Sequence, residues 1–271
     1  MPEFYFDSAA ESLSPLVEHL WFHGESVAPR GIETKEVPHL TIIIGHPNDC
    51  LMMGINRKWN HKLAALEALQ LIAGRQYPQL MAAVAPSTAR FLDGEAFHGA
   101  YGPRLRQQIP KIMDTLRMDM NSRQAIATIW DPAYDGFADT ADTPCTVYLS
   151  FMIRDGKLIM HTHMRSNDVW WGWCYDVTQF CSLQVHMATA MGLEVGPYVH
   201  YADSFHMYYE RDFDAVKELT DPADGHRDLL VPISLGAWQH QVDKARALLD
   251  GKIEWAQDSW LQHQAWRIHR G

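Results

Sequence analysis

The chain has 271 residues, a formal net charge of −10 and 47% hydrophobic residues. This composition excludes an intrinsically disordered chain, and the interspersed charges argue against direct nucleic-acid binding. The sequence has no apolar run of membrane-spanning length and no signal peptide at its acidic, polar start, so we expect no membrane association. Because no linker-like segment separates the apolar blocks, we expect one domain over residues 1–271.

The chain has four cysteines, Cys50, Cys145, Cys174 and Cys181. Four are too few for a disulfide framework in a chain of this length, and the spacing contains no CxxC zinc motif. We therefore expect a reduced, cytoplasmic protein, in the host cytoplasm if a phage encodes it. His161 and His163 share one face of a predicted strand, but two ligands without a third make a poor metal site, so we predict no metal.

Hydrophobic spacing predicts the elements in chain order. They are a strand over 39–45, a helix over 59–73 ended by Gly74 and Pro78, an irregular segment over 83–102, a helix over 103–118, a strand over 125–130, strands over 146–153 and 157–164, a helix over 175–191 closed by Gly192, a strand over 194–207 and a helix over 235–249. Asp155-Gly156 predicts a tight hairpin between the two central strands. The mixture predicts an α+β fold on a mostly antiparallel or mixed sheet.

Cys145 follows Pro144 at the start of the hairpin, and Arg165 follows its second strand. Because antiparallel strands return the chain to its starting point, these two residues are expected to be neighbours. A guanidinium beside a thiol favours the thiolate, the form that attacks carbon, and it also suits a phosphate. Cys145 is therefore a candidate nucleophile. The alternative left open is a small buried hydrophobic residue near a surface arginine.

Several segments together resemble the thymidylate synthase family, in the order and spacing of that family. They are Pro144-Cys145, Arg165-Ser166-Asn167-Asp168, Gly172, Gly192–Gly196 and Ser204–Tyr208, with Glu67, Tyr101-Gly102 and Ser122-Arg123 further back. The resemblance covers roughly residues 60–210 and is strongest between 144 and 208. It implies a thymidylate synthase-like fold, a large mixed sheet flanked by helices, and a homodimer formed sheet to sheet.

The resemblance also implies a reaction and its residues. Cys145 would add to carbon 6 of a pyrimidine nucleotide monophosphate, so that carbon 5 takes a one-carbon unit from 5,10-methylenetetrahydrofolate. Glu67 would order water and move protons, and Tyr101 belongs to the same catalytic group. The substrate would be bound by Arg165, Ser166, Arg30, His206 and Tyr208, and by Arg123 from the partner subunit. The folate would contact Asp168, Trp171, Gly172 and Tyr175.

Asp176 departs from the family pattern, because uracil-specific members carry asparagine there. Cytosine presents an acceptor at ring position 3 and an amine donor at position 4, the reverse of uracil. A carboxyl group can accept from the amine and, when protonated, donate to the ring nitrogen. Phage dCMP hydroxymethylases resemble the chain at this position, so Asp176 favours cytosine. The alternative left open is an N-cap for the helix that begins there.

The transferred carbon is predicted to end as hydroxymethyl, by addition of water, in preference to methyl. Residues 83–101 contain Phe91 and Phe97 but lack the tryptophans that shield this carbon in methyl-forming members, and residues 266–271 do not resemble their apolar closing tail. The leading interpretation is a dCMP hydroxymethylase. A dCMP methyltransferase, a CMP hydroxymethylase, a dUMP thymidylate synthase and a catalytically silent nucleotide-binding homologue remain alternatives.

Overall fold

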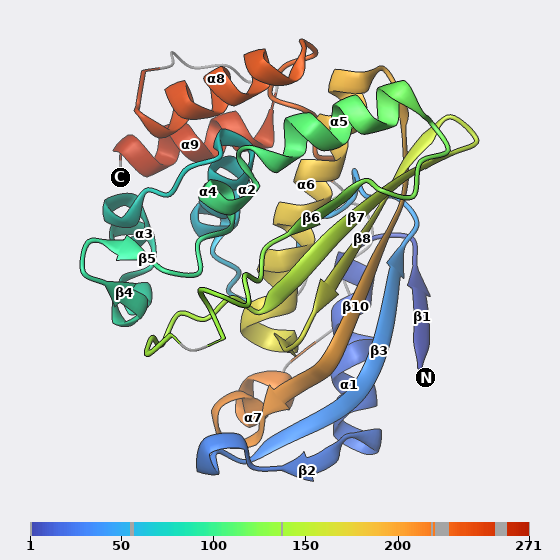
Figure 1. Cartoon of the computed structure of the whole chain (residues 1–271). Coiled ribbons are helices and arrows are strands. Elements are labelled where there is room, and N and C mark those ends of the chain that lie inside the picture. The colour runs from blue at the N-terminus through green and yellow to red at the C-terminus, as the bar shows by residue number, and fades with distance from the viewer. Residues whose placement is uncertain are drawn as a thin grey trace.

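A mixed β-sheet forms the centre of the protein (Figure 1). The structure is a computed structural model that describes residues 2–54, 57–136, 138–217, 219, 228–252 and 259–270. The strands follow the order β1-β3-β10-β8-β7-β6, with β2 paired to β3 and β9 paired to β10. Their bounds are β1 Glu3–Phe6, β2 Glu25–Val27, β3 Thr34–Ile44, β6 Ile126–Thr128, β7 Thr146–Arg154, β8 Lys157–Met164, β9 Asn167–Asp168 and β10 Glu194–Tyr208.

Strand directions in the sheet are mixed, as predicted. β10 runs antiparallel to β3 and parallel to β8, while β7 and β8 form an antiparallel hairpin. The hairpin turns at Asp155 and Gly156, whose φ angles are 51° and 73°. These positive values are those of a tight two-residue turn, which explains why a glycine stands there. The predicted hairpin and the predicted α+β class are both confirmed.

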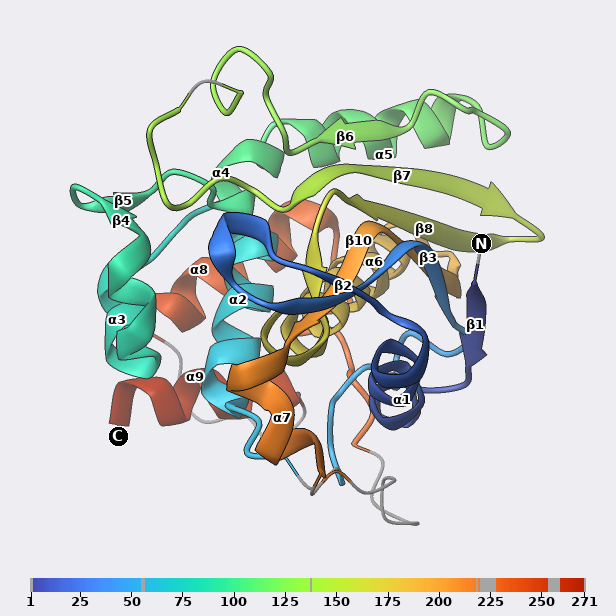
Figure 2. The ribbon, with the colours of Figure 1, turned by 90° about the horizontal axis from the view of Figure 1, so that it is seen from below.

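Helices cover one side of the sheet (Figures 1 and 2). Their bounds are α1 Leu13–His23, α2 His61–Ala73, α3 Pro78–Val84, α4 Tyr101–Leu105, α5 Gln108–Met118, α6 Cys174–Met191, α7 Tyr209–Lys217, α8 Trp238–Leu249 and α9 Trp260–Arg270. α6 is buried along most of its length and packs between the sheet and α2. Within the described ranges, no helix combines the length and the apolar character that crossing a bilayer requires.

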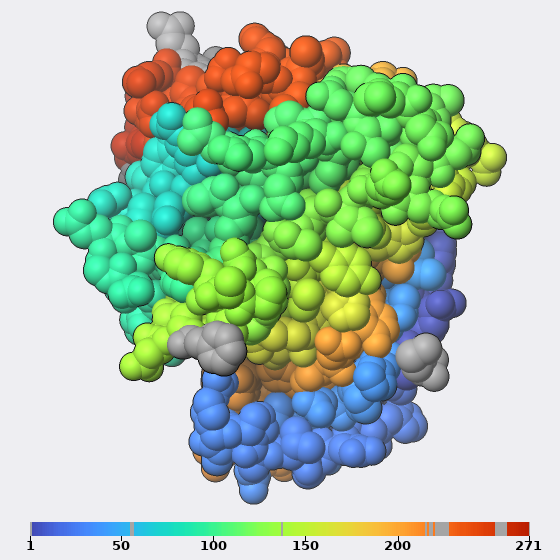
Figure 3. Space-filling model, in the orientation of Figure 1, coloured from blue at the N-terminus to red at the C-terminus, as the bar shows by residue number. Residues whose placement is uncertain are grey.

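The strand side chains alternate between the helical core and an open face. In β7, Leu149 and Phe151 are buried, whereas Tyr148, Ser150 and Met152 are partly exposed. The partly exposed residues line a hollow of about 450 Å³ together with side chains of β8 and β10. In Figure 3 the atoms of these strands come to the surface below α5. This side of the sheet, which we call the open face, therefore carries aromatic and aliphatic groups without a helical cover.

Two predicted boundaries are wrong. The helix expected over 103–118 is two helices, α4 and α5, because Pro110 cannot donate to the carbonyl four residues back and its ring crowds that carbonyl. The strand expected over 39–45 already begins at Thr34. The helix expected over 175–191 is found as α6, and it is preceded by a π-helix over Val169–Trp173, which Asp168 caps through its Oδ1 atom. The other predicted strands and helices are found close to their expected ranges.

The segment over 83–102, expected to be irregular, consists mostly of short helices and strands. It contains a 3-10 helix, Pro86–Phe91, and the two short strands β4 Leu92–Asp93 and β5 Ala96–Phe97. Tyr101 and Gly102, however, already belong to α4. Helices α1, α3, α7 and α9 are absent from the sequence-based prediction.

A buried ion pair clamps the loop between β6 and β7. Arg104 donates to Oδ2 and Oδ1 of Asp135 over 2.6 and 2.8 Å, and His98 lies 2.8 Å from the same carboxylate. Burial acts to raise the pKa of Asp135, but hydrogen bonds from Arg104 and from the Asp131 backbone outweigh it and lower that pKa to about 2. The pair fixes a long loop that leads directly into Cys145.

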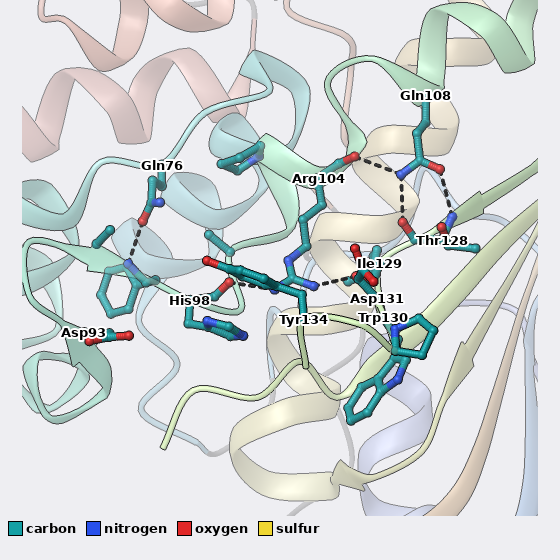
Figure 4. A pocket seen from close by; sticks show the side chains of 15 residues that line it. Gln76, Asp93, His98, Arg104, Gln108, Thr128, Ile129, Trp130, Asp131 and Tyr134 are labelled. Carbon is teal, nitrogen blue, oxygen red and sulfur yellow. Dashed lines mark hydrogen bonds between the residues drawn. The ribbon is translucent and has the colours of Figure 1, made fainter. Parts of the chain in front are cut away.

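A cavity of about 740 Å³ lies beside this ion pair (Figure 4). The ring of Tyr134 stacks on His98 with centroids 4.6 Å apart. Trp130 also lines the cavity, and the Arg165 guanidinium lies 5.5 Å from the centroid of its ring. The loop clamp is thus continuous with the wall beside Arg165.

Removing the clamp is expected to destabilise the protein. In Asp135→Ala the buried Arg104 loses its counter-charge, so the free energy of unfolding should fall by about 3 kcal/mol. Urea denaturation followed by circular dichroism measures this. Asp139→Ala, an exposed change in the same loop, is the matched control and should leave the midpoint unchanged. Equal midpoints for both variants would contradict the assignment.

Candidate active site

The hairpin places Cys145 and Arg165 side by side. The backbone N–H of Arg165 donates to the Cys145 carbonyl over 2.9 Å, and Nη2 of Arg165 lies 4.0 Å from the Cys145 sulfur. The guanidinium also donates to the carbonyls of Pro144 and Thr143. Burial raises the pKa of the Cys145 thiol, and the Arg165 charge acts in the opposite direction. The predicted neighbours are therefore in contact, and the thiol is only partly exposed.

Tyr101 holds the strand that begins at Cys145. Its hydroxyl accepts the backbone N–H of Thr146 over 3.3 Å. Burial raises the pKa of Tyr101 well above its ordinary value, and the nearby charges of Asp176 and Cys145 add to this effect. Gly99 packs closely against the residues that precede Cys145. A Cβ at position 99 would come within 2.5 Å of the Asp142 carbonyl oxygen. Close packing thus fixes where Cys145 enters the site.

Two carboxyl groups share the buried interior beside Cys145. Burial, together with a smaller effect of the Asp176 charge, raises the pKa of Glu67 on α2 to about 8. Burial likewise raises the pKa of Asp176 to about 7, although hydrogen bonds from Gln179 and Asn167 oppose that rise. The Oε2 atom of Glu67 is buried without a hydrogen-bond partner among the described residues. Both groups can therefore exchange protons near neutral pH.

The N-cap alternative for Asp176 is wrong. Asp176 is the third residue of α6, and Trp173 occupies the N-cap position. The Asp176 carboxyl group instead accepts from Asn167 Nδ2 over 2.8 Å and from Gln179 Nε2 over 2.9 Å. Gly172 permits this contact, since a Cβ there would lie 2.8 Å from Asn167 Nδ2. Asp176 is thus a buried, hydrogen-bonded group beside the thiol.

Ser166 and His206 lie near Arg165. Ser166 is the next residue along the chain, and His206 of β10 pairs with Asp168 of β9. His206 packs against Tyr208 with ring centroids 5.4 Å apart. Arg30 is exposed in the turn before β3, at the end of the sheet that contains Tyr208.

Arg123 is far from Cys145 of its own chain. It precedes β6, where the Ala125 carbonyl accepts from Phe151, six residues along β7 from Cys145. At ~3.3 Å per residue this separation is about 20 Å. Arg123 is exposed and remains a prediction for the partner subunit.

The predicted folate residues cluster around the π-helix. Trp171 is 54% exposed, whereas Tyr175 is buried and its hydroxyl accepts from the Asn60 backbone. One oxygen of Asp168 caps the π-helix and the other accepts from Arg211 on α7. Gly172 packs against Asn167, as described above. The cofactor roles of these residues remain predictions.

A family model for thymidylate synthase matches residues 53–230. The chain belongs to the thymidylate synthase family. It is similar to the deoxyuridylate hydroxymethyltransferase of Bacillus phage SP01, with 32% identity over 205 residues, 69% of this chain and 54% of that protein. It is also similar to the deoxyuridylate hydroxymethyltransferase of Pseudomonas phage M6, with 31% identity over 179 residues, 63% and 51% of the two chains. The chain thus spans about half the length of these curated relatives.

This member of the thymidylate synthase family has four site residues to which sequence reasoning gave no role. Asn167 and His200 lie beneath Asp176, Arg211 pairs with Asp168, and the Arg57 guanidinium lies 5.4 Å from the ring centroid of Trp171. Asn167 stands inside the recognised motif, and its amide was the available signal. His200 and Arg211 gave no signal, because only the pairing of β9 with β10 brings their segments together.

Among the residues described, no three His, Cys, Asp or Glu side chains gather around a common point. His163 instead pairs with Asp203 over 3.2 Å, and His161 stands on the open face. The four cysteines are free.

Loss of the Arg165 charge is expected to slow alkylation of Cys145. The thiol pKa is already raised, so the thiolate fraction is small at neutral pH and grows as the pH rises. Arg165→Ala removes the stabilising charge, and iodoacetamide should then react about threefold to tenfold more slowly at pH 8. Peptide mass spectrometry measures the rate. The buried Cys50, Cys174 and Cys181 are internal controls, and an unchanged Cys145 rate would refute the electrostatic role.

Glu67 is expected to make stability depend on pH. Its pKa is about 8 in the folded protein but about 4.3 in an unfolded chain, so the folded state retains a proton that the unfolded state releases. Stability from this group is therefore lost as the pH rises from about 4 to 8. Glu67→Gln should raise Tm by a few degrees at pH 8.5 and by less at pH 5.5. Glu18→Gln, an exposed change on α1, should show no such difference.

Proposed function

We propose that this protein transfers a one-carbon unit from 5,10-methylenetetrahydrofolate to carbon 5 of a cytosine nucleotide, and that water completes the product as 5-hydroxymethyl-dCMP. The observation that carries the proposal is the buried carboxyl group of Asp176, whose charge acts on the Cys145 thiol and which stands where uracil-specific relatives place an amide. The proposed site thus combines a thiol nucleophile, Cys145, with a protonatable carboxyl group, Asp176.

Cys145 forms and breaks the covalent bond to the base. Its thiolate adds to carbon 6, and the extra electron pair makes carbon 5 nucleophilic. The folate co-substrate supplies the carbon at the methylene level. A base then takes the proton from carbon 5, the bond between the methylene carbon and the folate nitrogen breaks, and tetrahydrofolate leaves. Water adds to the exocyclic methylene carbon that results, and the Cys145 sulfur leaves carbon 6. Glu67, with its unpartnered Oε2 and raised pKa, is the group suited to order that water and move these protons.

The phosphate is bound by Arg165, which thus has two tasks. Its guanidinium stabilises the thiolate and provides a planar fork for phosphate oxygens. Ser166 adds a hydroxyl, and His206 and Tyr208 bind the sugar hydroxyl. The turn that carries Arg30 lies at the Tyr208 end of the sheet. This position supports Arg30 as a second phosphate ligand.

The π-helix supports binding of a folate. A pterin is flat and a folate ends in carboxylates, so the site requires an aromatic platform and a cation. Exposed Trp171 provides the platform. Arg57 lies against Trp170 and Trp171, and its Nε and Nη1 atoms are buried without partners among the described residues. Asp168 and Tyr175 border the same region.

The open face supports a homodimer formed sheet to sheet. It carries Tyr148, Met152 and Tyr201, which are partly exposed and unlike an ordinary hydrated surface. A two-fold axis through such a face brings Arg123 of one subunit toward the site of the other. Arg123 is about 20 Å along β7 from its own Cys145, so it can serve only a partner's phosphate. Four free cysteines fit the expected cytoplasmic location.

Two features favour hydroxymethyl over methyl. Both phage relatives are hydroxymethyltransferases by name. Residues 266–270, which do not resemble an apolar closing tail, belong to helix α9, which packs against α2 and α8. The same relatives also support a second candidate, hydroxymethylation of dUMP, because their names specify deoxyuridylate.

The products identify the reaction. The protein is incubated with dCMP, CMP or dUMP and methylenetetrahydrofolate, and the products are weighed by mass spectrometry. We expect 5-hydroxymethyl-dCMP, without the dihydrofolate absorbance that accompanies methyl formation. Cys145→Ala should abolish both product formation and tritium release from position 5. Hydroxymethyl-dUMP as the main product would establish the second candidate.

Asp176→Asn is expected to shift the preference from dCMP toward dUMP. The amide serves the N–H and carbonyl of uracil, whereas the carboxyl group serves cytosine. The ratio of kcat/KM values for the two nucleotides should change by about a hundredfold or more. Asp214→Asn, an exposed change on α7, is the control. An unchanged ratio would show that base choice resides elsewhere.

A further inference from the structure

A protonated aspartate does not by itself distinguish cytosine from uracil. The carboxyl group has one donor oxygen and one acceptor oxygen, so it matches cytosine in one arrangement and uracil in the opposite one. Within the proposed function, the choice of base therefore depends on which oxygen of Asp176 carries the proton. Something in the surrounding structure has to decide this.

A line of buried hydrogen bonds leads from β10 to one oxygen of Asp176. Asn167 Nδ2 lies 2.8 Å from Asp176 Oδ2, and Asn167 Oδ1 lies 3.1 Å from His200 Nε2. On the other side of the imidazole, His200 Nδ1 lies 2.9 Å from the Tyr198 hydroxyl. Asn167 is 2% exposed, and His200 and Tyr198 are fully buried. We call Tyr198, His200 and Asn167 the relay.

The relay has one direction. An ionised carboxylate only accepts, so Asn167 turns its N–H groups to Asp176 and its oxygen to His200. Burial lowers the pKa of His200 to about 3, so its ring is neutral and carries a single N–H. That N–H is on Nε2 and donates to Asn167, which leaves Nδ1 to accept from the Tyr198 hydroxyl.

Hydrogen bonding opposes reversal of the relay. Reversal would turn over the Asn167 amide and set its oxygen against the Asp176 carboxylate, where two acceptors would repel each other. Oδ2 of Asp176 therefore stays an acceptor. Gln179 Nε2 donates to Oδ1 over 2.9 Å, but the relay does not hold this amide. The Gln179 amide can turn over and accept a proton carried by Oδ1, so a proton taken up by Asp176 goes to Oδ1.

We propose that Tyr198, His200 and Asn167 are positioning residues that hold Oδ2 of Asp176 as an acceptor and direct its proton to Oδ1, and that this order of donor and acceptor selects the base. The relay sets specificity for the proposed reaction without touching the nucleotide. When its direction is lost, Asp176 can present either arrangement, and discrimination between dCMP and dUMP falls.

The direction of the relay is measurable in the unaltered protein. In ¹⁵N-histidine NMR, His200 should show a protonated Nε2 and an unprotonated Nδ1 between pH 6 and 8. The His200→Gln variant assigns its signals. A proton on Nδ1 would overturn the proposal, whichever nucleotide is the substrate.

The effect on base choice is tested by variants that change the relay by one group. Tyr198→Phe removes only the hydroxyl, and His200→Leu removes the donor to Asn167. The ratio of kcat/KM for dCMP to that for dUMP should fall by about tenfold in each. His200→Gln keeps a donor and an acceptor and should restore the ratio. Thr178→Val, which removes a buried hydroxyl of α6 outside the relay, is the matched control.

The two proposals fail in different ways. If the unaltered protein prefers dUMP, the proposed function is wrong, while the NMR result still tests the relay. If it prefers dCMP and the ratio stays within twofold in Tyr198→Phe and His200→Leu, the relay has no role in specificity. Tritium release from position 5 in each variant shows that Cys145 is still active, and Tyr198→Phe, which keeps the ring, remains informative if His200→Leu does not fold.

Discussion

The site depends on the antiparallel pairing of β7 with β8. One backbone hydrogen bond, from Arg165 to the Cys145 carbonyl, closes the open end of the hairpin and sets a cation 4.0 Å from the sulfur. A thiol in this partly buried position resists ionisation, and the neighbouring guanidinium counteracts that effect. In the proposed function Arg165 also binds the nucleotide phosphate, which anchors the base beside the Cys145 thiol.

Burial raises the pKa values of the two carboxyl groups, Glu67 and Asp176. In water both would be ionised at neutral pH, but burial raises the pKa of Glu67 to about 8 and that of Asp176 to about 7. Asp176 accepts from two hydrogen-bond donors, whereas Oε2 of Glu67 has no hydrogen-bond partner among the described residues. The same buried environment thus gives both groups a pKa near neutrality, as their proposed roles require.

Several elements could be predicted because their signals are local. Asp155-Gly156 needs only its own backbone preferences to turn the hairpin, and the helical spacing of α2 is visible in its leucines. α1 was within reach as well, since Leu13, Leu16, Val17 and Leu20 have helical spacing. α9 was within reach too, since Leu261, Ala265 and Ile268 have helical spacing. The hydrophobic spacing over 103–118 does not show the break between α4 and α5, which Pro110 causes.

The sequence by itself determined the family and the contact of Cys145 with Arg165, and it predicted Cys145 as the nucleophile and Asp176 as the unusual residue, because ordered motifs and a hairpin turn are properties of the chain read along its length. Only the tertiary structure decided what surrounds them. His200 is 24 residues beyond Asp176 and Arg211 is 43 beyond Asp168, and each reaches the site because β10 lies between β3 and β8 and receives β9 beside it. Burial and hydrogen-bond direction follow from such distant pairings, so no local pattern encodes them.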